Sequence, residues 1–286
     1  MLQKNKKTIG KIILISIFIL ALLLRIWGIN FGLKDNKGMS DEGGITRNAH
    51  RVSVGELRPT QYIYPASTLI YGVGTLYIPI HFLYNLITSS KADLHKQGII
   101  NYGWFYFVGR FIVALIGSFT VLILYKIGKT IFNKKVGYSA ALFLAVCPLH
   151  VRLSHYFTVD VTLTFFLLLV ILYSYTHIYK KDNLKSALLP GIFLGLCVAT
   201  KYTGIIGIVP IISAHILKII QEQNKNIFYK FKKIIFSKRL WLIFLISIIV
   251  FSLVSPYFWF DISKAINNVT REAKNNHSNH GGLGFL

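Results

Sequence analysis

Apolar segments of nearly membrane-spanning length recur along this chain, and they restrict its fold more than any other feature. The first runs from Ile12 to Phe31, directly after a lysine-rich N-terminus. A helix needs about 20 apolar residues to cross the hydrocarbon core of a bilayer. No small-residue cleavage site follows this segment, so we interpret it as a retained signal-anchor helix. The pattern predicts an all-α fold, a polytopic transmembrane helical bundle.

Composition supports the membrane class. Hydrophobic residues make up 53% of the 286 residues and charged residues only 15%, unlike soluble domains. The net charge of +22 could indicate nucleic-acid binding. However, the lysines cluster in short loops, where they set topology and meet anionic lipid headgroups, so we expect no nucleic-acid partner. Cys147 and Cys197 lie inside apolar segments, and we expect no disulfide.

The positions of the lysines decide which apolar segments cross the membrane. If residues 65–87 formed a simple span, the later lysine groups would lie outside the cell. If this segment instead returns to its starting side, as an interfacial or re-entrant helix, the lysine groups are all cytoplasmic. We therefore predict about seven spans in a single membrane-embedded domain, with a first external loop at 32–103. The predicted spans are 12–31, 104–126, 136–149, 160–179, 187–201, 203–218 and 239–258.

This topology describes an integral multi-pass membrane protein, in the plasma membrane, with a cytoplasmic N-terminus. It collects the unusual charged and titratable side chains on the outer face, whereas the inner loops carry mostly lysine. The outer regions hold Asp41, Glu42, His150, His155, Asp160, Lys201, His277 and His280. The chemistry of the protein is therefore expected on the outer face.

Adjacent carboxylates at a membrane border, as in Asp41-Glu42, indicate a functional site. The following apolar spacing predicts a short helix lying on the membrane, so the alternative is that the acids only stabilise its N-terminus. Asp160 has the same alternative, because it opens an apolar run as an N-cap would. These two readings stay open from the residues alone.

Basic and histidine side chains on the outer face also allow two readings each. Lys201 could extend to lipid headgroups, although positive charge is disfavoured on that side. Arg110, in the outer part of an apolar run, could bind a lipid phosphate or a substrate phosphate. His277 and His280 have a spacing that permits a metal pair, but without further ligands nearby they are better explained as solvated loop residues.

Several short motifs, in this order and spacing, resemble the GT-C type glycosyltransferases that use lipid-linked sugars. That family includes protein O-mannosyltransferases and lipid A aminoarabinose transferases, and the resemblance covers essentially the whole chain. The motifs are Ser40-Asp41-Glu42, Tyr64-Pro65, Gly109-Arg110-Phe111, the segment from Cys147 to Asp160, and the segment from Gly195 to Gly204.

The resemblance implies transfer of a sugar from a polyprenyl-phosphate carrier to an acceptor on the outer face. It places the base or acceptor-positioning group at Asp41, with Glu42 beside it, and a second acid at Asp160. It places a cation near the donor phosphate at Lys201. We expect further substrate contacts from Arg110, Arg152, His155, Tyr64 and Tyr202.

Simple chemistry gives independent reasons for such a set. Inverting displacement of a lipid phosphate needs a base behind the incoming hydroxyl, and Asp41 fits that role. Fixed cations stabilise the negative charge gained by the departing phosphate. The sequence contains no phosphate-binding loop or dinucleotide fingerprint. We expect no required cofactor, although some members of the wider fold use a divalent metal. The expected partners are the lipid-linked donor, membrane lipids, and a lipid, polysaccharide or protein acceptor.

Two departures from the family pattern matter. Gly43-Gly44 loosens the helix expected after Glu42, and Tyr64-Pro65-Ala66 replaces the Lys-Pro-Pro type motif of the aminoarabinose transferases, which argues against that substrate. Family members usually continue through more spans, so we expect this chain to be an N-terminal portion. The alternative functions are a transporter or flippase for a lipid-linked sugar, and an inactive partner subunit. The concentration of charges on one face and the absence of an internal repeat argue against transport.

Overall fold

The computed structural model describes residues 2–33, 40–60, 65–88, 103–180, 183–221, 226–268 and 270. Within these ranges the regular structure is helical, without any strand, and this confirms the predicted all-α helical bundle. In chain order the elements are α1 (Leu2–Ile26), α2 (Ser40–Ser53), α3 (Ser67–Thr88), α4 (Gly103–Ile131), α5 (Lys134–Val146), α6 (Pro148–Leu153), α7 (Val159–Tyr173), η1 (Ser174–Tyr179), η2 (Leu184–Ala187), α8 (Leu188–Thr200), η3 (Tyr202–Gly207), α9 (Ile208–Ile220), α10 (Ile227–Ile235), α11 (Lys238–Val254) and α12 (Pro256–Phe260).

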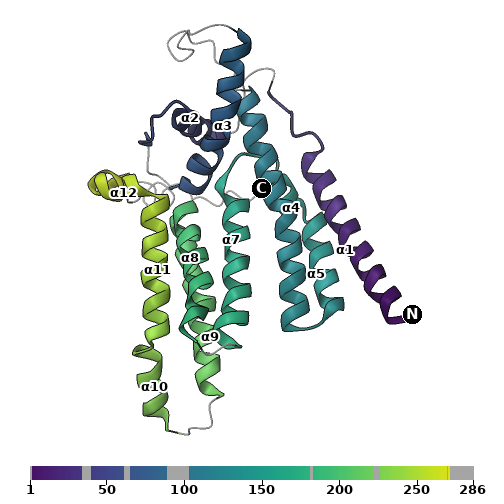
Figure 1. Cartoon of the computed structure of the whole chain (residues 1–286), viewed down its shortest axis with the longest axis vertical. Helices are drawn as coiled ribbons and strands as arrows, with labels where there is room; N and C mark the ends of the chain where they lie inside the picture. Colours follow the sequence, from purple (N-terminus) through teal and green to yellow (C-terminus); the bar gives the residue numbers. More distant parts are fainter. Residues whose placement is uncertain are drawn as a thin grey trace, which may run out of the picture.

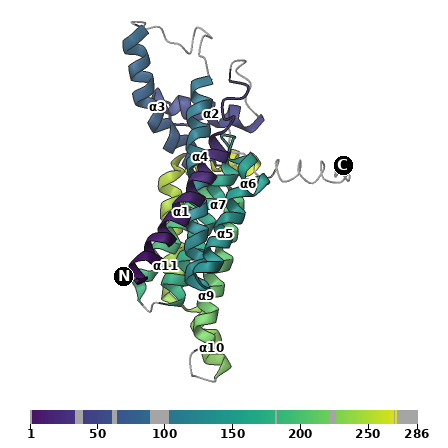
Figure 2. The ribbon, with the colours of Figure 1, turned by 90° about the vertical axis from the view of Figure 1, so that its right-hand side faces the viewer.

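The long helices run side by side between the two ends of the molecule (Figures 1 and 2). α4 packs against α5 and α7, α7 packs against α8, and α8 packs against α11. α1 lies along α4 and α5. Because the chain direction alternates, α7 begins at the end where α8 finishes, while α10 lies at the opposite end (Figure 1).

Five segments among the described residues are long and apolar enough to cross a membrane: Thr8–Ile26, Gly103–Ile131, Val159–Tyr179, Tyr202–Ile220 and Lys232–Val254. The apolar segment Leu184–Thr200 is shorter, and α5 has only 13 residues. The multi-pass architecture is thus confirmed, whereas the number of about seven spans stays a prediction.

Two predicted span ends differ from the helices observed. The first span was expected to reach Phe31, but α1 ends at Ile26 and turns follow, with positive φ at Gly28 and Gly32. Glycine adopts positive φ without steric strain, and this backbone conformation ends the helix. The last span was expected to continue to residue 258, but Pro256 begins the separate helix α12. Proline cannot donate the hydrogen bond that would continue α11.

Close helix contact in the second half of the bundle depends on small residues. Gly191 and Gly195, one turn apart on α8, face α11, where a Cβ on Gly195 would lie 2.6 Å from the backbone oxygen of Ser247. A Cβ on Gly191 would lie 2.9 Å from that of Ile243. Small residues at this spacing let membrane helices approach closely.

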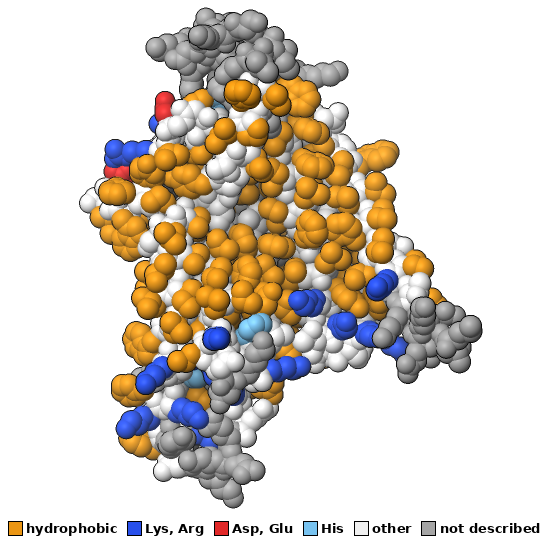
Figure 3. Space-filling view, viewed as in Figure 1, with side chains coloured by type: hydrophobic (Ala, Val, Ile, Leu, Met, Phe, Trp, Pro, Cys, Tyr) orange, Lys and Arg blue, Asp and Glu red, His pale blue; other side chains and the backbone are white. Residues whose placement is uncertain are grey.

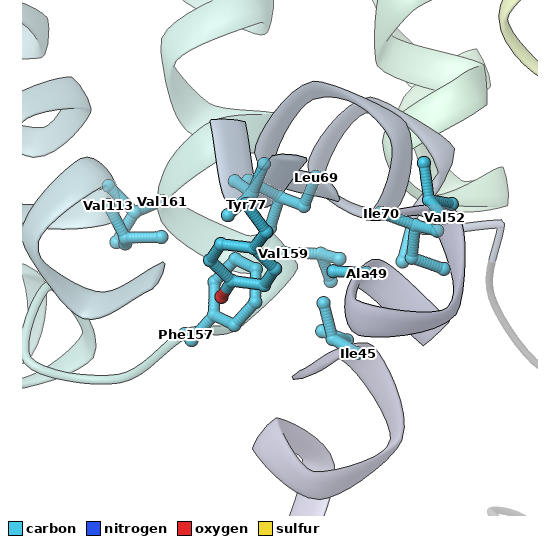
Figure 4. Packing of buried hydrophobic residues seen from close by; sticks show 12 residues of the cluster. Ile45, Ala49, Val52, Leu69, Ile70, Tyr77, Val113, Phe157, Val159 and Val161 are labelled. Atoms are coloured by element: carbon cyan, nitrogen blue, oxygen red, sulfur yellow. The ribbon is translucent and has the colours of Figure 1, made fainter. Parts of the chain in front are cut away.

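α2 and α3 lie together at the end of the bundle where α7 begins (Figure 1). They form an apolar cluster with α4 and the segment before α7, and Ile45, Tyr77 and Phe157 are among its buried members (Figure 4). α3 is not one of the five candidate spans. An interfacial helix would lie in this position, although its return to the starting side stays a prediction.

Charge separates the two ends of the molecule. An apolar belt covers the middle, and Lys and Arg gather along its lower border, below α4 and α5 as well as around α9 and α10 (Figure 3). This distribution agrees with the lysine pattern from which the topology was predicted.

Candidate active site

Asp160 and Lys201, which the sequence placed on one face, form an ion pair. Asp160 lies in the first turn of α7, and Lys201 is the C-cap of α8 with an extended backbone, φ −153°. The Lys201 Nζ donates to Asp160 Oδ1 at 2.9 Å, and the two side chains are 35% and 40% exposed. A cation and a carboxylate are therefore held together where a ligand can still reach them.

The N-terminus of α3 is fixed beside this pair. The backbone N–H of Ala66 donates to the carbonyl oxygen of Thr200 at 3.1 Å, and the hydroxyls of Thr68 and Thr200 lie 2.8 Å apart. Thr200 directly precedes Lys201. The first loop of the chain is thus joined to the loop that carries the cation.

Asp41 and Glu42 occupy the first turn of α2, which confirms the helix predicted after these acids despite Gly43 and Gly44. Their environments differ completely. The Asp41 carboxylate is exposed and forms no ion pair with a described residue, whereas Glu42 is fully buried. The pair therefore consists of one accessible acid and one inaccessible acid.

Glu42 is held by a two-contact ion pair with Arg110. Arg110 Nε donates to Glu42 Oε1 at 2.8 Å, Nη2 donates to Oε2 at 2.9 Å, and both side chains are 0% exposed. Glu42 Oε1 also accepts the backbone N–H of Phe157 at 2.7 Å. One carboxylate thus connects α2, α4 and the segment that leads to Asp160.

The remaining donor of Arg110 faces the chain after α1. Nη1 donates to the carbonyl oxygens of Ile29 and Phe31 at 3.0 and 2.7 Å, and the guanidinium lies 4.1 Å from the Phe31 ring centroid. All of these partners belong to the protein itself. Both side chains are thus occupied by partners within the chain, and the substrate contact predicted for Arg110 and the catalytic role predicted for Glu42 stay predictions.

His155 and Arg152 lie just before α7. Both ring nitrogens of His155 lie 2.8 Å from backbone oxygens, those of Val151 and Trp27, so His155 links this segment to the end of α1. Arg152 is exposed. Of the two predicted substrate contacts, Arg152 is thus exposed, whereas His155 is half-buried.

Tyr202 follows Lys201 and lines a small cavity of about 10 Å³ together with Pro65, Ser67 and Tyr257. Its ring centroid lies 6.2 Å from that of Phe258. Tyr64, His277 and His280 fall outside the described residues. Within the described ranges, no group of three or more metal-ligating side chains occurs.

Two polar connections were not predicted from the sequence. Arg58 pairs with Asp261, which ties the first loop to the chain after α12.

The second connection is made by Arg25, at the end of α1, which is fully buried. Arg25 donates to the backbone oxygens of Ala21 and Ala145 at 2.9 and 3.1 Å, and to His150 Nδ1 at 2.9 Å. Burial and, secondarily, the charge of Arg25 lower the pKa of His150 to about 4. An arginine inside an apolar run was the available sequence signal for this contact.

Comparison with known proteins identifies a family for most of the helical bundle. A family model described as dolichyl-phosphate-mannose-protein mannosyltransferase matches residues 103–260, from the start of α4 to the end of α12. The match includes Arg110, Asp160 and Lys201 and excludes Asp41 and Glu42. No curated protein and no solved structure matches the chain.

The matched region is more than half of the 286 residues and contains most of the helical bundle. It supports a multi-pass membrane glycosyltransferase that depends on a polyprenyl-phosphate-linked sugar. The chain belongs to the dolichyl-phosphate-mannose-protein mannosyltransferase family.

Proposed function

We propose that this protein transfers a glycosyl group, with inversion, from a polyprenyl-phosphate-linked sugar to an acceptor hydroxyl on the outer face of the plasma membrane, with its N-terminus in the cytoplasm. The observation that carries the proposal is the contrast between Asp41 and Glu42. Glu42 is buried against Arg110 and anchors the first turn of α2, so that the adjacent Asp41 is both exposed and fixed in place.

Asp41 would act as the base or would position the acceptor. In the reaction, the acceptor oxygen attacks the anomeric carbon and its proton passes to the Asp41 carboxylate. The bond from the anomeric carbon to the phosphate oxygen breaks, and the phosphate leaves with the electron pair. A base within reach of the acceptor proton contributes about 10²–10⁴-fold to such a step.

Lys201 would stabilise the charge gained by the departing phosphate. Its Nζ is already oriented by Asp160 and stays partly exposed. The apolar side chains of Ile205, Ile206 and Val209 lie in the candidate span Tyr202–Ile220, which begins directly after Lys201, and are 52%, 61% and 58% exposed. A prenyl tail in the lipid could run beside them while its phosphate reaches Lys201.

Arg152 is the second cation that supports donor binding, because it is exposed beside the segment that ends in Asp160. Asp160 would contribute by holding Lys201, and Tyr202 by lining the adjacent small cavity. We expect the reaction to proceed without a divalent metal, so that activity persists after treatment with a chelator.

The test uses the full chain in vesicles with a radiolabelled polyprenyl-phosphate sugar and outer-face acceptors. The Asp41→Asn variant should lose transfer by about 10²–10⁴-fold. The matched control is Glu56→Gln, because Glu56 belongs to the same loop, is 52% exposed and pairs with Arg51 at 3.0 Å. It should keep its activity. Undiminished transfer by Asp41→Asn would exclude the proposed base, and carrier movement across vesicles without sugar transfer would support a flippase instead.

A further inference from the structure

A basic cavity lies at the end of the bundle opposite Asp160 and Lys201. Its volume is about 350 Å³, and it opens between the end of α9, the start of α11 and the η2 turn. It is lined by His215 and by the cationic side chains of Lys218, Lys233, Lys238 and Arg239. None of its described lining residues is a carboxylate. Like charges held together this closely favour an anionic occupant.

Two further features point to an oxyanion. His215 lines the cavity and is 5% exposed, and neither of its ring nitrogens makes a hydrogen bond of standard geometry to a described residue, apart from an electrostatic contact with the Lys233 backbone. A buried polar group usually has such a partner. The cavity also contains Ser237, the N-cap of the 17-residue helix α11. Helix N-termini favour negative charge.

The location of the cavity identifies the class of anion. It lies where the candidate span Tyr202–Ile220 ends and the candidate span Lys232–Val254 begins. If these spans cross a bilayer, their ends lie at the depth of the lipid headgroups. Leu184 and Phe236 line it and are 54% and 70% exposed, which gives the site an apolar side as well. A free phosphate ion would make no favourable contact with these apolar side chains, whereas a phospholipid would pack its acyl chains against them.

We infer that this cavity binds the phosphate headgroup of an anionic phospholipid and fixes the ends of α9 and α11 to one another. Basic pockets between membrane helices are suited to such headgroups. This lipid is distinct from the sugar carrier, because the cavity lies at the end of α9 and the start of α11, opposite the end of the bundle where α7 begins (Figure 1).

The experiment measures lipid binding to the purified full chain in detergent. Phosphatidylglycerol, phosphatidylcholine and inorganic phosphate are titrated separately, with binding followed by native mass spectrometry and by the midpoint of thermal unfolding. Phosphatidylglycerol should bind and raise the midpoint, and the other two should not. The Lys218→Gln/Lys233→Gln variant should bind phosphatidylglycerol about tenfold more weakly or worse.

The matched control is Lys126→Gln/Lys135→Gln, which removes two exposed charges near the loop between α4 and α5. It should bind like the parent. Because a misfolded variant would lose binding trivially, Lys218→Arg/Lys233→Arg is also measured and should bind normally. A separate readout is the lipid that copurifies with the unaltered chain, which should be enriched in anionic species relative to the membrane.

Three results would overturn the inference. They are an equal loss of binding in both Gln variants, an effect of inorganic phosphate as large as that of phosphatidylglycerol, and no enrichment of anionic lipid in the unaltered protein. The first would show diffuse surface attraction, the second a free-anion site, and the third the absence of a lipid preference.

Discussion

Glu42 and Arg110, 68 residues apart in the sequence, face each other through two hydrogen bonds inside the protein, and neither side chain touches solvent. Since Glu42 also accepts the N–H of Phe157, this pair connects the exposed Asp41 on α2 with the segment that leads to Asp160. The positions of two acids, Asp41 and Asp160, from separate parts of the chain therefore depend on one buried contact.

Removing one partner of this pair should be strongly destabilising. Glu42→Gln leaves the Arg110 guanidinium buried without its counter-charge, which costs about 3–5 kcal/mol. Glu42→Gln/Arg110→Met should cost less than the sum of the single changes, because no unpaired charge remains. Unfolding by sodium dodecyl sulfate in mixed micelles measures both. Glu56→Gln, in an exposed pair, should change stability by less than about 1 kcal/mol. If Glu42→Gln were no less stable than Glu56→Gln, the buried pair would not hold α2 and the segment before α7 in place.

Lys201 should affect activity far more than stability. Its ion pair with Asp160 is 35% and 40% exposed, and exposed pairs contribute at most about 1 kcal/mol. Lys201→Gln should therefore unfold almost as the parent does, but should bind the lipid-linked donor weakly and transfer sugar slowly. Lys201→Arg should recover much of the activity, because it restores the charge. Donor KM and kcat with the labelled polyprenyl-phosphate sugar provide the measurement. Unchanged kinetics in Lys201→Gln would leave this pair as a helix-terminal contact only.

The sequence predicted those features that depend on local pattern. The helix after Ser40, the acids in its first turn and the lysines at one end of the bundle follow from hydrophobic spacing and charge position. The proximity of Asp160 and Lys201 was predicted only as a shared face, yet the structure joins them by a hydrogen bond. The alternation of apolar segments thus predicted a shared end of the bundle for these two side chains, but not their ion pair.

Features that depend on tertiary contact could not be predicted in this way. Arg110 was expected to meet a phosphate because nothing in its own segment identifies Glu42 as its partner. Arg25 has its acceptors on α1 itself and more than a hundred residues away. Helix ends at Ile26 and Val254 differ from the predicted spans because glycine and proline interrupt apolar runs that hydropathy alone would continue.

Gly195 should not tolerate even one added methyl group. A Cβ at this position would lie 2.6 Å from the Ser247 backbone oxygen and 2.8 Å from Val250 Cβ, so α8 and α11 would have to separate. Gly195→Ala should therefore destabilise the protein by about 1–3 kcal/mol. The matched control is Gly72→Ala in α3, where an added Cβ meets nothing within 4 Å. That change should be neutral or stabilising, since alanine favours helices. Equal stability of the two variants, measured by detergent unfolding, would contradict the close contact of α8 with α11.

His150 should make stability depend on pH between about 6.5 and 4. Its Nδ1 accepts from Arg25 at 2.9 Å only while the imidazole is neutral, and its pKa is lowered to about 4 in the folded protein. The unfolded chain, with an ordinary histidine pKa near 6.5, binds the proton first as the pH falls. The folded state is therefore fully favoured above about pH 6.5 and loses that advantage as the pH drops through 4. The charge of Arg25 changes stability in the same direction, because a protonated His150 would face a buried guanidinium and would destabilise the folded state. His150→Gln isolates this contribution, since its amide oxygen can accept from Arg25 and does not titrate. Between pH 7 and 4.5 the thermal midpoint of the parent should fall more steeply than that of His150→Gln, while carboxylates common to both proteins cancel in the comparison. Parallel curves would mean that His150 does not stay neutral in the fold.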